Sequence, residues 1–400
     1  MPSPTIFLDP AARIDTANPQ RSALIDLGAI SGNVETLRGI AGTAKLMAVL
    51  KADGYGHGLV PAARAALRGG ADYLGTAVLE EAFALRAAGV DAPIFTWLNA
   101  PGSNYLRAIE EDIDLAAYDC AQLEEICQAA RQAGRPARVH LKIDTGMWRG
   151  GASAQDWPRL CGAARRALDA GLIEATGIWS HLAAADEPEN PSTSMQLAAF
   201  RAALAVARDL GITPRLRHIA NSAATLSNPE AHFDLVRPGI SVYGINPLPP
   251  EYRTSRMDLR PAMTLRAAVA HVKAAPAGAA VSYGGTERAA AATQLAIIPL
   301  GYADGVMRSA SSKGPVQIGA GRYRVIGRVC MDQFMVQVGS DAVVPGQQAL
   351  LFGPGTDGEP HLDQWAQAAD TIPYEILTRI GTRVPRIYLE SIPAPDVSGT

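Results

Sequence analysis

The sequence predicts an α/β protein in which a (β/α)₈ TIM barrel is followed by a mostly antiparallel β domain. From residue 46 to about residue 245, short apolar runs alternate with amphipathic stretches eight times. Eight such units within about 200 residues are enough to close a barrel. The helical rhythm stops near Asn246 to Pro250, and short β-rich segments follow. A doubly wound open sheet is the alternative, but no GxGxxG follows the first strand.

The barrel strands are expected where apolar runs end at turn residues. The eight runs span residues 46–51, 73–78, 93–98, 114–118, 137–143, 174–180, 216–220 and 235–242. Helical patterns lie between them, as in Leu123, Ile126, Cys127 and Ala130, which share one face at i, i+3, i+4 and i+7 spacing. Glycine and proline separate each helix from the next strand.

The second domain is predicted by its short β-rich segments. They span residues 264–275, 294–300, 314–319, 322–330, 334–338 and 348–352. We therefore expect a barrel domain at 22–255 and a β domain at 256–390. An early run at 22–27, before a helix at about 29–41, is a candidate to pair with the β domain rather than with the barrel.

The composition indicates a soluble enzyme and excludes several other classes. Hydrophobic residues make up 48% and charged residues 19%, and the net charge is 36 − 39 = −3. Without a basic stripe, neither nucleic acid nor an anionic membrane is an expected partner. The N-terminus lacks the features of a secretory signal, and no apolar run approaches the ~20 residues that span a bilayer. The four cysteines form no metal-binding spacing, so we expect a cytoplasmic protein without a metal site.

Residues 48–58, AVLKADGYGHG, carry the strongest local signal. An apolar run ends at one lysine, Lys51, and glycines follow at positions 54, 56 and 58. A lysine at the mouth of a barrel is partly desolvated, so its pKa falls and its amine can attack a carbonyl to form a Schiff base. The N–H groups of a glycine-rich turn can bind a phosphate. From the pattern alone, a solvated lysine at a strand end is the alternative.

Polar side chains also follow four later strands of the predicted barrel. They lie in KIDTGMWR (142–149), in Ser180-His181, in Asn221-Ser222 and in Arg237-Pro238-Gly239-Ile240. The carboxyl ends of barrel strands surround the active site. Polar residues at five strand ends therefore indicate one shared catalytic site.

With these motifs in view, the chain resembles the alanine racemase family, whose members bind pyridoxal 5′-phosphate and combine a barrel with a C-terminal β domain. The resemblance runs from about residue 22 to residue 388. It rests on nine segments in the same order: 48–58, 142–151, 180–188, 218–224, 236–244, VSYGGT (281–286), PLGYADG (299–305), GRVCMDQ (327–333) and 371–388.

The resemblance implies two catalytic residues, Lys51 as the Schiff-base lysine and Tyr283 as the second base. It implies that Arg149 and Met331 bind the substrate, and that Lys142 can carry a carbamate that pairs with Arg149. The implied cofactor contacts are Tyr55, Tyr374, Asn221, Ser222, Gly239 and Ile240 around the phosphate, His181 against the pyridine ring and Arg237 at the ring nitrogen.

General chemistry supports the implied roles of three of these residues. Racemisation removes the α-proton on one face and returns a proton on the other, so it needs two groups on opposite faces. A lysine and a tyrosine can serve, provided that cationic neighbours lower the pKa of the tyrosine. Arg237 does not give up its proton, so the ring nitrogen should stay unprotonated and side reactions should be disfavoured.

The expected function is interconversion of L-alanine and D-alanine, supplying D-alanine for peptidoglycan. A broader racemase acting on serine or basic amino acids is the alternative. A related decarboxylase is disfavoured by Arg237 and by the lack of a CxxxD-like segment in the β domain. A non-catalytic protein that only carries the cofactor is disfavoured because such proteins resemble the barrel alone, without the β domain. Trp148 and Gly150 depart from the family, which often has glycine and leucine there, and Asp53-Gly54 replaces Asn-Ala.

The linker at 246–261 predicts a homodimer with shared active sites. It is short and proline-rich, so it should act as a semi-rigid spacer. It would have difficulty folding the β domain over the barrel mouth of the same chain, whereas a two-fold pair allows each β domain to cover the other barrel. In the family, the tyrosine equivalent to Tyr283 comes from the partner subunit.

Overall fold

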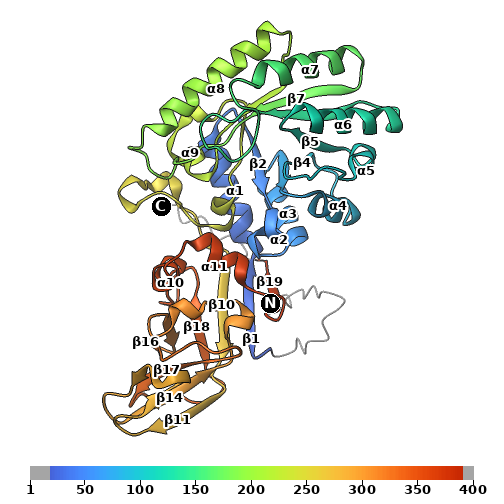
Figure 1. The fold of residues 1–400 in the computed structure, drawn as a ribbon. Coiled ribbons are helices and arrows are strands. Elements are labelled where there is room, and N and C mark those ends of the chain that lie inside the picture. Colours follow the sequence, from blue (N-terminus) through green and yellow to red (C-terminus); the bar gives the residue numbers. More distant parts are fainter. Residues whose placement is uncertain (1–18, 391–400) are drawn as a thin grey trace, which may run out of the picture. The chain divides into compact units, whose positions relative to one another are not determined.

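The computed structural model describes residues 19–390 (Figure 1). The segment in which no secretory signal was expected, residues 1–18, lies outside the described residues. The described chain divides into two compact units. The barrel unit holds residues 30–54 and 62–259, and the β unit holds residues 19–29, 55–61 and 260–390.

The barrel unit is an eight-stranded parallel sheet with the order β8-β7-β6-β5-β4-β3-β2-β9. Its strands are β2 (Lys45–Val49), β3 (Tyr73–Thr76), β4 (Ile94–Thr96), β5 (Ile113–Ala117), β6 (Ala137–Lys142), β7 (Ile173–Trp179), β8 (Leu216–His218) and β9 (Leu235–Val236). Beside β8 and β9, the Asp234 N–H donates to the Arg217 carbonyl and the Arg237 N–H to that of Ala220, each at 3.0 Å. These bonds join the two ends of the sheet, so the predicted barrel is confirmed and the open sheet is wrong.

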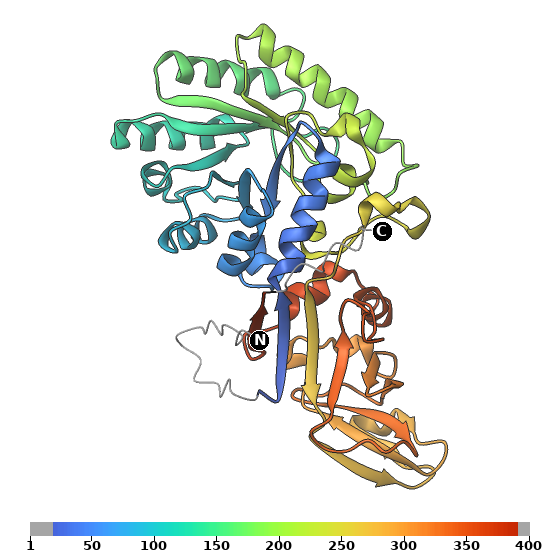
Figure 2. The ribbon, with the colours of Figure 1, turned by 180° about the vertical axis from the view of Figure 1, so that it is seen from behind.

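Helices surround the strands on the outside of the ring (Figures 1 and 2). They are α1 (Leu27–Ala41), α3 (Leu59–Arg68), α4 (Leu79–Ala87), α5 (Tyr105–Glu110), α6 (Cys120–Ala133), α7 (Trp157–Asp169), α8 (Ser192–Asp209) and α9 (Ser222–Ser227), and the short α2 (Lys51–Tyr55) lies between β2 and α3 in the chain. Helix α6 shows why these segments fold: Asp119 caps its first turn by accepting the Gln122 N–H, and Gly134 ends it in the left-handed region. Its apolar stripe is buried, as the spacing predicted.

A compact apolar cluster fills the barrel interior. Its fully or nearly fully buried members are Met47, Phe95, Ala116, Trp179, Leu216 and Leu235. Each comes from a different strand, because alternate residues of every barrel strand point inward. The cluster supports the polar groups that occupy the carboxyl ends of the same strands.

The β unit contains a nine-stranded sheet with the order β11-β14-β17-β16-β15-β18-β10-β1-β19. Its strands are β1 (Arg21–Asp26), β10 (Met263–Ala268), β11 (His271–Ala275), β14 (Thr293–Ile298), β15 (Pro315–Ile318), β16 (Gly321–Ile326), β17 (Phe334–Gly339), β18 (Gln348–Phe352) and β19 (Arg386–Leu389). A two-stranded ribbon, β12 (Ala280–Val281) and β13 (Glu287–Arg288), and helices α10 (Leu362–Ala369) and α11 (Pro373–Arg379) complete it. Strand β1 pairs antiparallel with β10 and parallel with β19.

Several predicted strands are too long. The strand expected at 235–242 ends at Val236, because Pro238 has no N–H for a ladder bond and residues 240–243 form a 3₁₀ turn. The strand expected at 264–275 is two strands, because the chain leaves β18 after Ala268 and pairs with β14 from His271 onward. The strand expected at 322–330 ends at Ile326, before Gly327 at a φ of 71°. Within the described part of the chain, no helix is long and apolar enough to cross a membrane.

Candidate active site

Lys51 lies at the carboxyl end of strand β2, two residues after the strand ends. Strand β2 stops at Val49, and Lys51 opens the short helix α2. The next four residues, Ala52 to Tyr55, have φ between 53° and 60°, so the chain makes a left-handed turn. Three of these residues are not glycine, and each costs about 1–2 kcal/mol in this conformation. Strain of this kind is typical of functional sites.

The surroundings of Lys51 favour its neutral amine. Burial is the largest effect and lowers its pKa, the nearby Arg149 guanidinium lowers it further, and Glu81 opposes the shift. Glu81 also accepts the Ala52 N–H at 2.7 Å, which ties the left-handed turn to helix α4. A lysine with a lowered pKa can act as a nucleophile and as a proton acceptor, which supports the chemistry predicted for Lys51.

Lys142, at the end of strand β6, is almost completely buried, with 5% of its surface exposed. Its Nζ lies 4.7 Å from the centre of the Tyr118 ring and 4.3 Å from that of Trp179. Burial, followed by the charges of Arg149 and Arg237, lowers its pKa to about 7. With this pKa, Lys142 loses its proton more readily than an ordinary lysine.

Positive charge accumulates around these strand ends without an equal negative charge. Among residues 19–390, the side chains of Lys142, Arg149 and Arg237 make no ion pair with a carboxylate within 4 Å. Burial is the main cause that lowers the pKa of Arg237, to about 9, and Arg149 adds to it. A cluster of cations, of which Lys142 and Arg237 are buried, is suited to bind a ligand that carries a phosphate and a carboxylate.

Arg237 is held by a line of buried polar groups that runs through the barrel. Its Nη1 lies 3.0 Å from His218 Nδ1, His218 Nε2 lies 2.8 Å from His140 Nδ1, and His140 Nε2 lies 3.2 Å from Asp114 Oδ2. Arginine only donates and carboxylate only accepts, so both imidazoles are neutral with the proton on Nε2. Burial, followed by Arg237, keeps the pKa of His218 well below its usual value, which agrees. We call these four residues the Arg237 relay.

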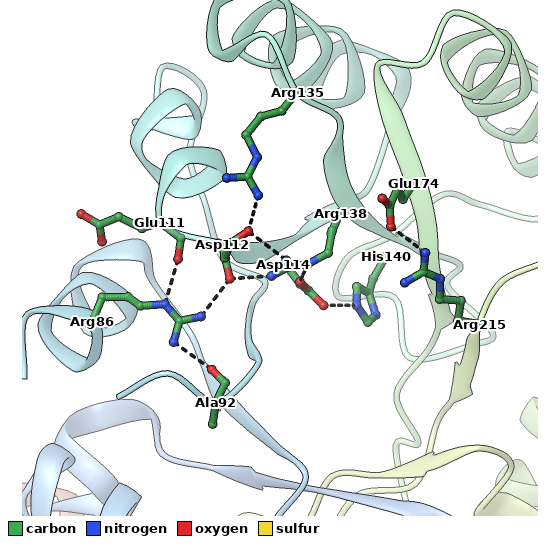
Figure 3. Close-up of polar contacts among 10 residues, drawn as sticks. All are labelled: Arg86, Ala92, Glu111, Asp112, Asp114, Arg135, Arg138, His140, Glu174 and Arg215. Carbon is green, nitrogen blue, oxygen red and sulfur yellow. Dashed lines mark hydrogen bonds and ion pairs between the residues drawn. The ribbon is translucent and has the colours of Figure 1, made fainter. Parts of the chain in front are cut away.

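The far end of the relay is anchored by Arg138, near the opposite end of the strands (Figure 3). Arg138 donates to Asp114 and, at 3.1 Å, to Asp112. Gly177 on strand β7 leaves room for His140, because a Cβ at this position would lie 2.8 Å from two ring atoms of the imidazole. The relay therefore depends on a glycine as well as on its polar members.

The loops after β8 and β9 form a second part of the site. Ser222 Oγ accepts the N–H groups of Gly239 at 2.8 Å and of Ser241 at 3.4 Å. Asn221 caps helix α9 through Ala224, and Ile240 begins the 3₁₀ turn at residues 240–243. These bonds hold the main chain of residues 239–241 beside Ser222, at the strand ends where the resemblance implies contacts to a phosphate. His181 approaches Arg237 with Nδ1 3.3 Å from Nη2, and burial, then Arg237, holds its pKa well below the usual value.

The β unit holds the other predicted residues. Tyr283 and Met331 line an open hollow of about 650 Å³ and are 73% and 53% exposed. Tyr55 and Tyr374 lie together, with ring centres 6.2 Å apart.

The main chain at Met331 is fixed by a neighbouring turn. Ala303 N–H donates to the Met331 carbonyl at 3.0 Å, and a Cβ on Gly301 would overlap that carbonyl. The turn is stabilised by the buried carboxylate of Asp304, which accepts the Gly301 N–H at 2.9 Å and pairs with Arg383 at 3.2 Å. A rigid backbone therefore presents Met331 to the hollow.

The structure thus brings together some predicted residues and adds others. In the barrel unit, Lys51, Lys142, Arg149, His181 and Arg237 influence one another's charges. Sequence reasoning missed the supporting residues Tyr118, Trp179, His140, His218 and Asp114. His218 is the first residue of the segment HIANSAA, and His140 and Asp114 lie in otherwise apolar strands. Polar residues within strands expected to be buried could therefore have pointed to these three supporting residues.

Comparisons with known proteins identify the family to which the chain is similar. Residues 25–247 match the family described as alanine racemase, N-terminal domain, and residues 262–388 match alanine racemase, C-terminal domain. The chain is 55% identical over 370 residues to the alanine racemase of Salinispora tropica, covering 92% of this chain and 98% of the relative. It is 53% identical over 370 residues to that of Thermobifida fusca, with the same coverage of 92% and 98%.

Solved structures show the same likeness. The crystal structure of alanine racemase from D-cycloserine-producing Streptomyces lavendulae superposes with a TM-score of 0.92 at 51% identity, covering 94% of this chain and 98% of that one. The alanine racemase of Streptomyces coelicolor gives a TM-score of 0.91 at 52% identity, covering 93% and 98%. Because both domain descriptions match and the relatives are covered almost completely, the chain belongs to the alanine racemase family.

Proposed function

We propose that this chain interconverts L-alanine and D-alanine with pyridoxal 5′-phosphate attached to Lys51. The observation that carries the proposal is Lys51 itself, a strand-end amine whose pKa is lowered by burial and by Arg149. Such an amine can bond to the aldehyde of the cofactor. As a member of this family the chain is an isomerase, and none of the named relatives favours serine or basic amino acids.

The residues around Lys51 fit the cofactor. When bound, pyridoxal phosphate withdraws electrons from the substrate and makes its α-proton removable. The cation cluster suits a phosphate. The residues proposed to hold it are Ser222, Asn221, Gly239, Ile240, Tyr55 and Tyr374. His181 is proposed to pack against the ring.

Arg237 is proposed to face the pyridine nitrogen and to keep it unprotonated. The relay supports this role, because neutral His218 accepts from Arg237 and leaves the guanidinium charged. Arg237 Nη2 also donates to the Ser180 carbonyl at 2.8 Å, so the guanidinium is fixed from two sides. A donor that does not release its proton cannot protonate the ring nitrogen.

Lys51 and Tyr283 are proposed to move the α-proton on opposite faces of the substrate. Lys51 suits one face because its amine is readily neutral, and Tyr283 offers an accessible phenol. Arg149 is proposed to bind the substrate carboxylate together with the main chain of Met331. The Lys142 amine, with a pKa of about 7, can add carbon dioxide, and the resulting carbamate would place a negative charge beside Arg149.

The working form is proposed to be a cytoplasmic homodimer in which each subunit completes the site of the other. The exposure of Tyr283 and Met331 supports this form, since a catalytic tyrosine needs shelter from water. The product D-alanine would serve peptidoglycan synthesis.

The proposal is tested with purified protein and L-alanine in deuterated water. The α-proton signal and the optical rotation should both disappear, and borohydride should fix the cofactor on the peptide that contains Lys51. A label on another lysine, or loss of neither signal in protein saturated with cofactor, would refute it.

A further inference from the structure

The segment that carries Arg149 is a closed turn between strand β6 and helix α7. At its base, Asp144 N–H donates to the Ala152 carbonyl and Ala152 N–H donates to the Lys142 carbonyl, both at 2.9 Å. These bonds fix the two ends of the turn. They leave residues 145–151 to be held by other means.

The side chain of Asp144 fills this turn. Its Oδ1 accepts the N–H groups of Gly146 and Met147 at 2.9 Å and of Trp148 at 3.2 Å, and its Oδ2 accepts the Arg149 N–H at 3.2 Å. Four successive amides therefore converge on one carboxylate. Hydrogen bonds to a charged acceptor are roughly twice as strong as bonds between neutral groups.

The turn needs this support because its backbone is unfavourable. Gly146 and Gly151 adopt their φ of 131° and 114° without steric cost, but Trp148, which is not glycine, has a φ of 55°. The indole of Trp148 is 85% exposed, so packing contributes little to holding that conformation. The carboxylate of Asp144 is the group that compensates for it.

Arg149 depends on the turn for its position. Its side chain is exposed and makes no ion pair in the part of the chain that the structure describes. Asp144 has both oxygens occupied by main-chain N–H groups, so it fixes the backbone of Arg149 without competing for the guanidinium. The charge of Arg149 acts on Lys51, Lys142 and Arg237, so a displacement would reach the whole site.

We propose that Asp144 is a positioning residue for the reaction, which holds the 145–149 turn in a strained conformation and so aims Arg149 at the substrate carboxylate. This inference rests on the proposed function. It assigns Asp144 a task separate from binding, because none of its bonds is directed toward a ligand. The competing explanation is that Asp144 acts only through its charge, as a partial counter-ion for Lys142.

The first test is Asp144→Asn in the cofactor-loaded enzyme. The amide oxygen can still accept from residues 146–148, but the amide NH₂ then faces the Arg149 N–H and repels it. We expect the KM for alanine to rise about tenfold while kcat changes less than about threefold, because binding of the carboxylate is what weakens. Asp119→Asn is the matched control, since asparagine caps helix α6 as well as aspartate does.

Two further variants separate aiming from charge. In an Arg149→Ala background, Asp144→Asn should have no additional effect on kcat/KM, because the two residues act as one unit. Adding Trp148→Gly to Asp144→Asn should lower the KM most of the way back to the wild-type value, because glycine adopts a φ of 55° without strain. A pure charge effect would survive both changes.

An unchanged KM in Asp144→Asn, additive losses with Arg149→Ala, or failure of Trp148→Gly to restore binding would overturn the inference. If Asp144→Asn does not fold, as judged by its melting curve, the double variant with Trp148→Gly is measured in its place and must bind alanine nearly normally. If neither the wild type nor Asp119→Asn racemises alanine, the proposed function is refuted instead.

Discussion

Gly177→Ala should disrupt the Arg237 relay although it replaces no residue that is proposed to bind the substrate or the cofactor. A Cβ at position 177 would lie 2.8 Å from Cγ and from Cε1 of His140, and closer still to Nδ1. The imidazole cannot retreat, because Phe95 stacks on it with ring centres 4.3 Å apart and the side chain is fully buried. The hydrogen bonds from His140 to His218 and to Asp114 must therefore break or stretch.

The expected loss of stability follows from two terms. Overpacking in a core costs about 1–3 kcal/mol. A buried polar group left without its partner costs about 1–3 kcal/mol more. The sum, about 2–6 kcal/mol, corresponds to a fall in melting temperature of roughly 4–24 °C for a unit of this size. Activity should also fall, because His218 no longer has a partner that fixes its tautomer for Arg237.

Thermal melting by circular dichroism and racemisation of L-alanine measure both effects. Gly162→Ala in helix α7 is the matched control, because its Cβ would meet only Arg166 Nη1 at 3.7 Å and alanine favours a helix. A Gly177→Ala protein that melts with the wild type and racemises alanine at the wild-type rate would refute the reasoning about the relay.

Three other perturbations give distinct outcomes. Arg237→Glu should increase transamination, seen as pyruvate formed from alanine, because a carboxyl group can protonate the ring nitrogen; unchanged pyruvate would contradict the assignment. Lys142→Met should raise the melting temperature at pH 7 in CO₂-free buffer, and the gain should shrink toward pH 10. The reason is that burial lowers the pKa of Lys142 from 10.5 to about 7, so the unfolded chain binds more protons between these values and wild-type stability rises with pH there; a gain that grows with pH would be the opposite result. Mixing inactive Lys51→Ala and Tyr283→Ala proteins should restore activity as subunits exchange, because one hybrid site is intact. Hybrids that form but stay inactive would exclude a shared site.

The sequence predicted the barrel and the strand-end residues of the site because both follow from short patterns. Lys51, Lys142 and Arg237 each stand where an apolar run ends, and parallel strands end at one face. The left-handed turn after Lys51 was not predictable in the same way, since Ala52 and Asp53 have no strong preference for positive φ. The Arg237 relay depends on the register between strands, including an irregularity between Val139 and His140, and a single sequence does not contain that register.

The place of strand β1 has a consequence for how the chain is made. Ala23 pairs with Leu265 in β10 and with Arg386 in β19, near the opposite end of the described chain. A ribosome adds roughly 5–20 residues per second, so β1 waits roughly 20–70 s for its last neighbour. Until then, the edge of β1 that pairs with β19 is open to other chains. The barrel residues lie between β1 and β19 in the sequence, so they are synthesised earlier and can already fold. We therefore expect newly made chains that stop short of β19 to aggregate through this edge while their barrels are intact.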